Sequence, residues 1–517
     1  MGKYREALEL IKKENPFPAV CGRICPRFCE SECTRGDIDQ PLAVDEVKKF
    51  LADWEIKAEN RFVPNKRYNF GFGEPVAVIG AGPAGLSCAY YLAIDGLKVT
   101  VFEKEEKLGG MLTLGIPSYR LEKDVVEAEI DVLRQLGVEF KTGVEVGKDI
   151  SIPELRKQGF KAFYVAIGAQ GGRKLGLEGE DSEGVIAGVD FLRGVNLGKG
   201  AKLSGNVIVI GGGNVAIDVA RSAVRSGAGS VDLYCLESRA EMPALEEEIV
   251  EAEEEGIKIN NSWGPVRVIT ENGKVKGVEF KKCTAVFDKD GKFNPQFDEK
   301  ETKIVEASFV LLSVGQSIQW GGLLEGSQVK LGRGNTAEAD GFTYQTAEPD
   351  IFVGGDAFTG PKFAIDAIAA GKQGAISIQR FVQPGQTLDF GRDRREYKMF
   401  DKDNLVVEGY DNTPRQQVGH TPSKRKTFLD PRVTFTEEQV KAETARCLGC
   451  GAVQIDEYRC IGCGQCTTKC KFDAISLKKV SNDFAPSFEL LPLKVAPYAV
   501  KRAGKIAVRT VKDLVGK

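Results

Sequence analysis

Cysteine is the residue type whose spacing points most directly to chemistry in this sequence. Six of the 13 cysteines lie close together near the C-terminus: Cys447, Cys450, Cys460, Cys463, Cys466 and Cys470. The last four have the spacing C-x2-C-x2-C-x3-C, which is typical of the thiolate ligands of a [4Fe–4S] cluster. Zinc is the alternative, because the two C-x2-C pairs could form a tetrahedral site of four thiolates. A zinc site would leave Cys466 and Cys470 unused, so the spacing favours iron and sulfur.

The same six cysteines limit the number of clusters. In proteins with two clusters and this spacing, the fourth cysteine of the run serves the other cluster, so Cys470 could join Cys447 and Cys450 there. Two clusters together need eight ligands, more than six cysteines supply. The sequence therefore predicts at least one [4Fe–4S] cluster, and a second needs other side chains or a partner chain as ligands.

A second group of four cysteines lies near the N-terminus: Cys21, Cys25, Cys29 and Cys33. Only Cys88, Cys235 and Cys283 lie outside the two groups, and such clustering indicates metal or iron–sulfur ligands in preference to a disulfide framework. The single histidine, His420, argues strongly against haem, Rieske, histidine–zinc and Ser-His-Asp chemistry. Because the N-terminal residues lack the apolar stretch of a signal peptide, we expect a reducing cytoplasm.

Two glycine-rich turns indicate nucleotide binding. The first contains Gly80, Gly82, Pro83, Ala84 and Gly85, between an expected strand over 75–80 and an expected helix over 84–93. In this fingerprint the first glycine forms a tight turn, the second lets the backbone approach a pyrophosphate, and the third lets the helix pack on the strand. The N-terminus of the helix then faces the phosphates. Glu103 ends the next strand, 18 residues beyond Gly85, where an acid accepts hydrogen bonds from ribose hydroxyls.

The second turn repeats the pattern with Gly211, Gly213, Asn214, Val215 and Ala216. Alanine in the third glycine position is tolerated at such sites. The following strand, expected over 230–235, runs into Leu236 and Glu237. We expect Glu237 to bind the adenosine ribose 2′-hydroxyl and to repel a 2′-phosphate. The alternative is that Glu237 is a surface charge that follows a strand.

The elements that must hold these residues alternate between buried strands and amphipathic helices, which predicts parallel sheets. Further helices are expected over 3–13, 45–57, 123–136, 215–226, 246–255 and 363–381, and further strands over 98–102, 161–166, 206–210, 275–283, 303–313 and 350–353. A length of 517 residues suggests about three domains. The net charge of -3 gives no case for nucleic acid or an anionic membrane surface, and no apolar run is long enough for a membrane span.

Several longer phrases occur in a fixed order: CGRICPRFCESEC, VIGAGPAGLSCAYYLA, LGGMLTLGIPSYRLEKDVV, GGGNVAIDVAR, SRAEMPALEEEIVEAEEEGI and VGGDAFTGPKFAIDAIAAGKQG. Through them, residues from about Tyr4 to Phe381 resemble the glutamate synthase small-subunit family of FAD/NAD(P) oxidoreductases. This family includes the flavin end of dihydropyrimidine dehydrogenase and of the NADH-dependent ferredoxin:NADP transhydrogenase. A ferredoxin-like segment follows in this chain.

The resemblance implies that the first fingerprint binds FAD, because Gly355 and Asp356 match the late strand end that returns to the FAD domain and approaches the ribityl chain. It also implies FAD contacts at Gly110, Leu112, Arg120, Gly168 and Ala364. NADP-using members carry Tyr-Arg-Arg where this chain has Cys235-Leu236-Glu237. The loss of both arginines favours NAD(H) as the coenzyme.

The N-terminal cysteines resemble the second cysteine motif of the same family. Lys48 stands about where some relatives supply a glutamine or glutamate ligand. The sequence leaves two readings open, namely a cluster on these cysteines and a remnant fold with reduced thiols. If a cluster forms, we expect another polypeptide to complete it.

Together these features predict an α/β protein with two Rossmann-type domains, a helical N-terminal segment that contains cysteines, and a C-terminal ferredoxin-like domain. The expected ranges are 1–70 for the N-terminal segment, 71–200 with 335–385 for the FAD domain, 201–334 for the NAD(H) domain, 386–440 for an extended connector, 441–480 for the iron–sulfur domain and 481–517 for a basic tail.

The expected function is that of an FAD-dependent NAD(H) oxidoreductase that exchanges hydride with NAD(H) at FAD and single electrons with iron–sulfur clusters. No catalytic side chain is expected, because the flavin carries the chemistry. The sequence contains an input and an outlet for electrons but no substrate site. We therefore expect a subunit of a larger complex whose catalytic chain is a tungsten or molybdenum oxidoreductase, a hydrogenase or a CoA-ester reductase, with ferredoxin as another candidate partner.

Three other functions are weaker. A glutamate synthase small subunit is disfavoured by Glu237 and the ferredoxin-like segment. A disulfide reductase of the thioredoxin-reductase type needs a cysteine pair beside the flavin, whereas Cys88, Cys235 and Cys283 are isolated in the sequence. A non-catalytic scaffold would not need two intact fingerprints.

Overall fold

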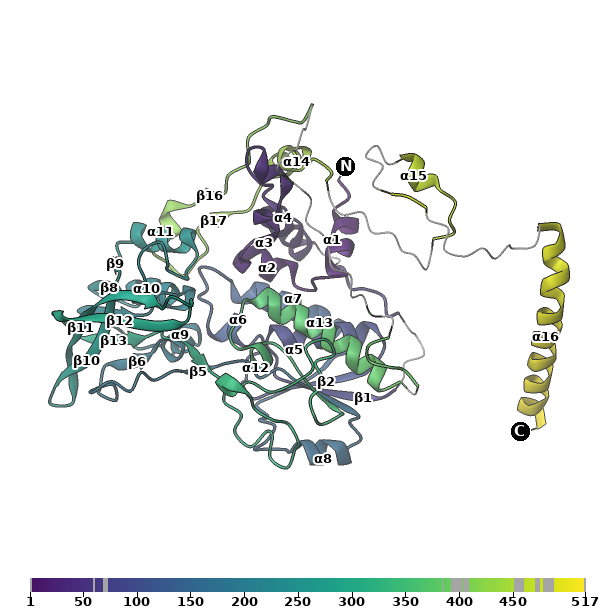
Figure 1. Cartoon of the computed structure of the whole chain (residues 1–517), viewed down its shortest axis with the longest axis horizontal. Helices are drawn as coiled ribbons and strands as arrows, with labels where there is room; N and C mark the ends of the chain where they lie inside the picture. The colour runs from purple at the N-terminus through teal and green to yellow at the C-terminus, as the bar shows by residue number, and fades with distance from the viewer. Residues whose placement is uncertain are drawn as a thin grey trace. The chain divides into compact units, whose positions relative to one another are not determined.

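The computed structural model describes residues 2–58, 61–67, 73–383, 385–390, 392, 402, 409–450, 460–469, 475–477 and 488–515. The chain divides into two compact units, Met1–Leu448 and Gly449–Lys517. The larger unit contains two parallel sheets with helices packed on them, which confirms the predicted α/β class (Figure 1).

The first parallel sheet carries the first fingerprint. Its strands follow the order β15-β4-β1-β2-β3. Their bounds are Pro75–Ile79 for β1, Lys98–Glu103 for β2, Glu139–Thr142 for β3, Ala162–Val165 for β4 and Ile351–Val353 for β15. Strand β1 is central and almost wholly buried. The glycine-rich turn that follows it therefore lies in the middle of the sheet, at the edge formed by the carboxyl ends of the strands. Strand β15 returns to this sheet from far along the chain, as the family resemblance implies.

Helix α5 (Pro83–Ile94) follows the fingerprint and is buried on nearly all sides. It packs against α13 (Ala364–Phe381) and α7 (Lys123–Gln135). Figure 1 shows these three helices on the side of the sheet that faces the N-terminal helices. Shorter helices complete this region: α6 (Met111–Leu114), α8 (Ile152–Lys157), η2 (Arg333–Asn335) and α12 (Asp356–Thr359).

The second parallel sheet carries the second fingerprint, with the order β6-β13-β7-β8-β9. Its strands are β6 (Val185–Ala187), β7 (Asn206–Ile210), β8 (Ser230–Tyr234), β9 (Lys258–Asn260) and β13 (Phe309–Leu312), and its helices are α9 (Gly188–Asn196), α10 (Asn214–Arg225) and α11 (Glu246–Glu254). An antiparallel sheet of β10 (Trp263–Glu271), β11 (Lys274–Phe287) and β12 (Phe293–Glu306) is inserted between β9 and β13, and β5 (Gly171–Gly172) pairs with β14 (Gln316–Ser317).

In this region, two boundaries predicted from the sequence differ from those in the structure. The strand expected over 303–313 is the end of β12 followed by β13, which belong to different sheets. Apolar and β-branched residues lie on both sides of the short junction at 307–308, so the sequence pattern does not reveal the change of sheet. Strand β6 lies in the range 71–200 assigned to the FAD domain, yet it pairs with β13 of the second sheet. That pairing is a long-range contact with no local signal.

The N-terminal helical segment is covered by the described part of the connector. The segment comprises α1 (Tyr4–Lys12), α2 (Pro18–Ile24), α3 (Phe28–Ser31), η1 (Thr34–Asp37) and α4 (Val44–Lys57), and the connector comprises β16 (Gly419–His420), η3 (Pro422–Lys424), β17 (Arg432–Val433) and α14 (Glu437–Ala445). The buried Arg446 donates to Asp39 Oδ1 (3.1 Å), and Glu443 Oε1 accepts from the Ala43 amide (2.9 Å). These contacts move the expected boundary at 441 to the end of the first unit at Leu448.

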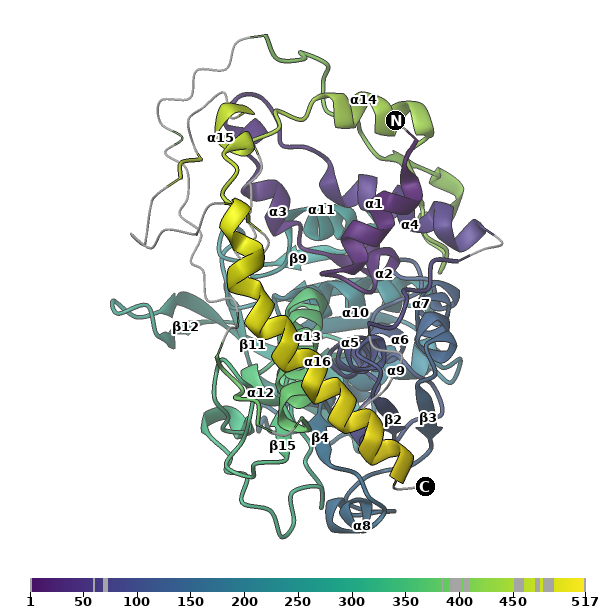
Figure 2. The same cartoon turned by 90° about the vertical axis from the view of Figure 1, so that its right-hand side faces the viewer.

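The second unit contains α15 (Gln465–Lys469), η4 (Phe488–Leu490) and α16 (Leu491–Val515). Helix α16, the long yellow helix of Figure 2, occupies most of the range expected as a basic tail. Among the helices in the described ranges, none is both long enough and apolar enough to cross a membrane.

Candidate functional site

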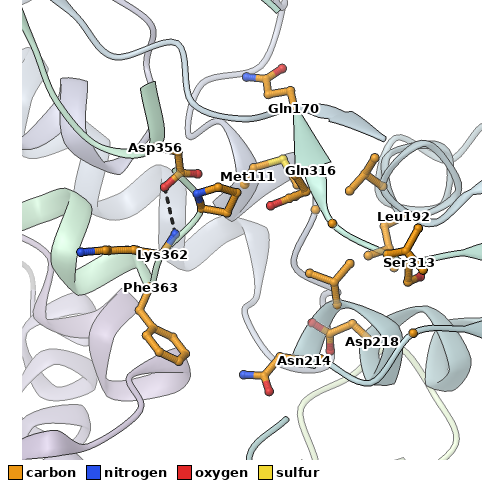
Figure 3. A pocket seen from close by; sticks show the side chains of 18 of the residues that line it. Met111, Gln170, Leu192, Asn214, Asp218, Ser313, Gln316, Asp356, Lys362 and Phe363 are labelled. Atoms are coloured by element: carbon orange, nitrogen blue, oxygen red, sulfur yellow. Dashed lines mark hydrogen bonds between the residues drawn. The ribbon is translucent and has the colours of Figure 1, made fainter. Parts of the chain in front are cut away.

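One cavity of about 670 Å³ is lined by residues that follow strands of both parallel sheets. Figure 3 shows Asp356 and Phe363 on one side of it and Asn214, Asp218 and Ser313 on the other. The carboxyl ends of parallel strands are where α/β proteins bind ligands. The fold therefore brings both fingerprints to a single space of the size that binds small molecules and cofactors.

Most of the predicted cofactor residues line this cavity. Those predicted for FAD are Gly82, Pro83, Ala84, Gly110, Leu112, Arg120, Gly168, Gly355, Asp356 and Ala364, and those predicted for NAD are Gly211, Gly213, Asn214, Val215 and Glu237. Gly80 and Glu103 line a smaller cavity of about 50 Å³, to which Gly168 also contributes. Gly85 lies behind the loop, where a Cβ would stand 1.9 Å from Gly80 O, so only glycine lets α5 approach β1 this closely.

Two carboxylates, the buried Glu103 and the half-buried Asp356, hold the loops of the first site. Glu103 Oε2 accepts from the Ala81 amide (2.7 Å), and its Oε1 accepts from the Glu105 amide (2.9 Å). Asp356 Oδ1 accepts from the Lys362 amide (3.2 Å; Figure 3), and burial raises the Asp356 pKa to about 6. Glu103 thus shapes the fingerprint loop in addition to facing the smaller cavity.

At the second site, Glu237 lies against the glycine-rich turn. A Cβ on Gly212 would stand 2.6 Å from Glu237 Oε2. Asn214 Oδ1 accepts from the Leu245 amide (2.8 Å), which fixes the loop before α11 beside the turn. Burial raises the pKa of Glu237. The carboxylate therefore lies beside the turn at the end of β8, where the sequence predicts the adenosine ribose.

Sequence reasoning missed two polar side chains of this cavity. Gln170 Oε1 and Ser313 Oγ are buried and have no hydrogen-bond partner among the described residues. An unmet buried polar group costs about 1–3 kcal/mol, so both atoms fit a bound ligand that carries hydrogen-bonding groups. Ser313 directly follows β13, and Gln170 lies in the loop between β4 and β5. This placement is the signal that could have identified them, since loops at the carboxyl ends of the strands form the binding crevice.

Arg120, predicted to contact FAD, joins the two nucleotide-binding regions. Its Nη1 donates to Asp218 Oδ2 of α10 (2.7 Å), and its Nη2 donates to Glu248 of α11. Burial raises the pKa of Glu248, although the Arg120 guanidinium opposes the shift. The connector joins the same point, where Arg432 Nη2 donates to Arg120 O (2.9 Å). An FAD contact of Arg120 remains a prediction.

We expect Arg120→Met to destabilise the apo-protein by about 3 kcal/mol, because two buried carboxylates would lose their shared cation. The free energy of urea-induced unfolding of the flavin-free protein measures this loss. The control is Arg267→Met, which removes the ion pair of an exposed arginine with Glu279 and should leave the stability nearly unchanged. Loss of FAD with unchanged stability of the apo-protein would instead make Arg120 a flavin ligand alone.

The N-terminal cysteines lie on α2, α3 and their ends, with Cys33 just before η1. Burial raises the pKa of Cys21 to about 12 and also raises the pKa values of Cys25 and Cys29, while the Lys48 ammonium opposes the shift at all three thiols. Three cysteines thus lie near one cation, which suits negatively charged thiolate ligands. Among the described side chains, no three potential ligands converge on one point, so the ligand set remains a prediction.

The C-terminal cysteines begin at the end of the first unit with Cys447. In the second unit, the Gly462 amide donates to Cys460 Sγ (3.4 Å), a contact of the kind that tunes cluster sulfurs. Gly462 and Gly464 have φ values of 67° and 74° and curl the loop between the cysteines. Cys470, the last predicted ligand, lies outside the described residues. The conformation of residues 460–464 is therefore compatible with a segment whose cysteines bind a cluster.

Comparison with known families matches three regions of the chain. Residues 74–371 match the pyridine nucleotide-disulphide oxidoreductase family. Residues 1–60 match domain II of dihydropyrimidine dehydrogenase, described as a 4Fe-4S cluster domain, and residues 453–476 match a 4Fe-4S binding domain. These matches correspond to the two cavity-forming regions, to the N-terminal cysteines and to the last four cysteines of the C-terminal group.

Comparison with individual proteins indicates the same kind of oxidoreductase. The chain is 35% identical over 482 residues to the NADP(+)-dependent formate dehydrogenase subunit beta of Moorella thermoacetica, covering 87% of this chain and 67% of that one. It is 33% identical over 403 residues to the glutamate synthase [NADPH] small chain of Escherichia coli, covering 74% of this chain and 84% of that one. FprA of Mycobacterium tuberculosis, solved with NADPH, shares the fold with a TM-score of 0.53 at 18% identity, over 60% of this chain and 84% of that one.

Proposed function

The chain belongs to the pyridine nucleotide-disulphide oxidoreductase family, in the group of the glutamate synthase small chain, and from this premise we propose that it is the NAD(H)-linked electron-transfer subunit of a larger redox complex. It is a flavin oxidoreductase with two 4Fe–4S domains. The observation that carries the proposal is the single cavity on which both nucleotide fingerprints open.

The N-terminal cysteines lie near the wall of this cavity, where a cluster bound to them could exchange electrons with the flavin. Ile24, next to Cys25, lines the cavity. Phe28 packs edge-to-face on the cavity residue Phe363, with ring centroids 5.7 Å apart. Bound FAD supplies the conversion between hydride transfer and single-electron transfer. The helices α2 and α3 hold the N-terminal cysteines against the space in which that conversion would occur.

A second contact extends this path toward the C-terminal cysteines. The buried Arg35, two residues after Cys33, donates through Nη1 to Arg446 O (2.8 Å). Arg446 directly precedes Cys447, so the start of the C-terminal group is anchored beside the end of the N-terminal group. We infer that electrons move between the cavity and an N-terminal cluster, beside which the C-terminal cysteine group begins at Cys447.

The partner is proposed on chemical grounds. The described residues supply a nucleotide input and cysteine outlets, and the cavity is accounted for by two cofactors. The catalytic chain would then be a formate-type tungsten or molybdenum oxidoreductase, a hydrogenase or a CoA-ester reductase. The second candidate is the small subunit of a glutamate synthase, which the similarity to the Escherichia coli small chain favours.

The test is anaerobic purification of the native complex, followed by addition of NADH. We expect bleaching of both flavin and iron–sulfur absorption, about eight irons per chain for two clusters, and a co-purifying catalytic subunit. A glutamine-dependent partner would select the second candidate. Zinc in place of iron, or a stand-alone enzyme that turns over a small organic substrate, would contradict the proposal.

A further inference from the structure

Trp263, at the start of β10, is held beside Glu237 by a sharp backbone turn. The Ser262 amide donates to Glu237 O (3.0 Å), and the Trp263 amide donates to Cys235 O (2.9 Å). Asn261 Nδ2 also donates to Glu237 O (3.2 Å). Ser262 has a φ of 63°, a left-handed conformation that is uncommon for a residue with a side chain. These bonds fix the start of β10 to the end of β8.

The indole ring of Trp263 is also fixed from the side of the antiparallel sheet. Lys303 Nζ lies 3.9 Å from a ring centroid of the indole, and Lys282 Nζ lies 5.0 Å from it. Both are cation–π distances. The half-buried ring lines the large cavity together with Leu236 and Glu237. Its orientation is therefore set before any ligand binds, which lowers the entropy cost of binding.

We propose that Trp263 is the stacking platform for the adenine base of the nicotinamide coenzyme, a role that rests on the proposed function. If Glu237 binds the adenosine ribose, the base is one glycosidic bond away and must lie along the adjoining cavity wall. Trp263 is an aromatic residue of that wall, and backbone hydrogen bonds tie it to this segment. Stacking of a base on an aromatic side chain contributes about 5- to 150-fold in affinity.

The test compares Trp263→Leu, which keeps apolar bulk, with Trp263→Phe, which keeps an aromatic face. For Trp263→Leu we expect the Kd of ADP-ribose and the KM of NADH to rise about 10- to 100-fold, with kcat little changed. Trp263→Phe should recover most of the affinity. Reduced nicotinamide mononucleotide lacks adenosine, so its reaction should be unchanged in both variants.

Quenching of tryptophan fluorescence by ADP-ribose gives a readout that does not depend on activity. It should be present in the wild type and in Trp54→Phe, a change on α4, and largely lost in Trp263→Phe. Equal weakening of the mononucleotide reaction would show a structural role and overturn the proposal, as would unchanged ADP-ribose binding by Trp263→Leu. If the wild type binds neither NADH nor ADP-ribose, the proposed function itself fails.

Discussion

Replacement of Leu236 and Glu237 by arginine together is expected to move the coenzyme preference from NADH toward NADPH. A 2′-phosphate on the adenosine ribose would lie about 4 Å from the Glu237 carboxylate, where unit charges interact by about 4 kcal/mol at an effective dielectric constant of 20. Because Glu237 is only half-buried, solvent lowers this to about 1.5–3 kcal/mol, or about ten- to a hundredfold in wild-type discrimination. The two arginines replace repulsion with attraction. The measurement is kcat/KM for both coenzymes.

The matched control for this pair is Glu241→Arg. Glu241 is exposed and accepts a hydrogen bond from Ser238 Oγ. Its replacement makes the same change of charge as Glu237→Arg alone, at a position away from the turn at Gly212. We expect it to leave the preference nearly unchanged. Equal use of NADH and NADPH by the wild type would show that Glu237 is only a surface charge, and the NAD(H) assignment would fail with it. Two relatives are named for NADP(+) and NADPH, so the measured preference of the wild type between NADH and NADPH decides whether this chain differs from them.

Gly82→Ala is expected to abolish flavin binding without unfolding the protein. Among the described residues, no atom lies within 4 Å of a Cβ built on Gly82, and its φ of -76° suits alanine. The methyl group would project where the second fingerprint glycine meets the pyrophosphate. We expect at least about a hundredfold weaker FAD binding with little change in the apo-protein melting temperature. Flavin absorbance and thermal unfolding measure the two effects.

Gly213→Ala is the matched variant at the other turn. Its Cβ also meets no described atom within 4 Å, and its φ is -93°. The protein should keep its flavin while the KM for NADH rises about 10- to 100-fold. If Gly82→Ala retains flavin, or if both variants lose flavin equally, the assignment of one cofactor to each turn is wrong.

The sequence alone was sufficient for features that depend on short-range spacing. The turn from Gly80 to Gly85 and the turn from Gly211 to Ala216 identify nucleotide sites because each role belongs to neighbouring residues. The predicted return of residues 350–353 to the first sheet came from resemblance to known flavoproteins, and β15 confirms it. The C-terminal cysteine run predicted an iron–sulfur domain, which the match over 453–476 confirms. The N-terminal cysteines left a cluster and a remnant fold as alternatives, and the match over 1–60 to a 4Fe-4S cluster domain favours the cluster.

Only the tertiary structure decided how these parts meet. Arg120 pairs with Asp218 and Glu248, 98 and 128 residues away, and no local periodicity encodes such a contact. The same holds for Ile24 at the cavity wall and for Trp263 beside Glu237, because both positions follow from the packing of separate segments. Spacing along the chain determines which cofactors a segment can hold, whereas the shared cavity arises from burial and ion pairing between segments that are distant in sequence.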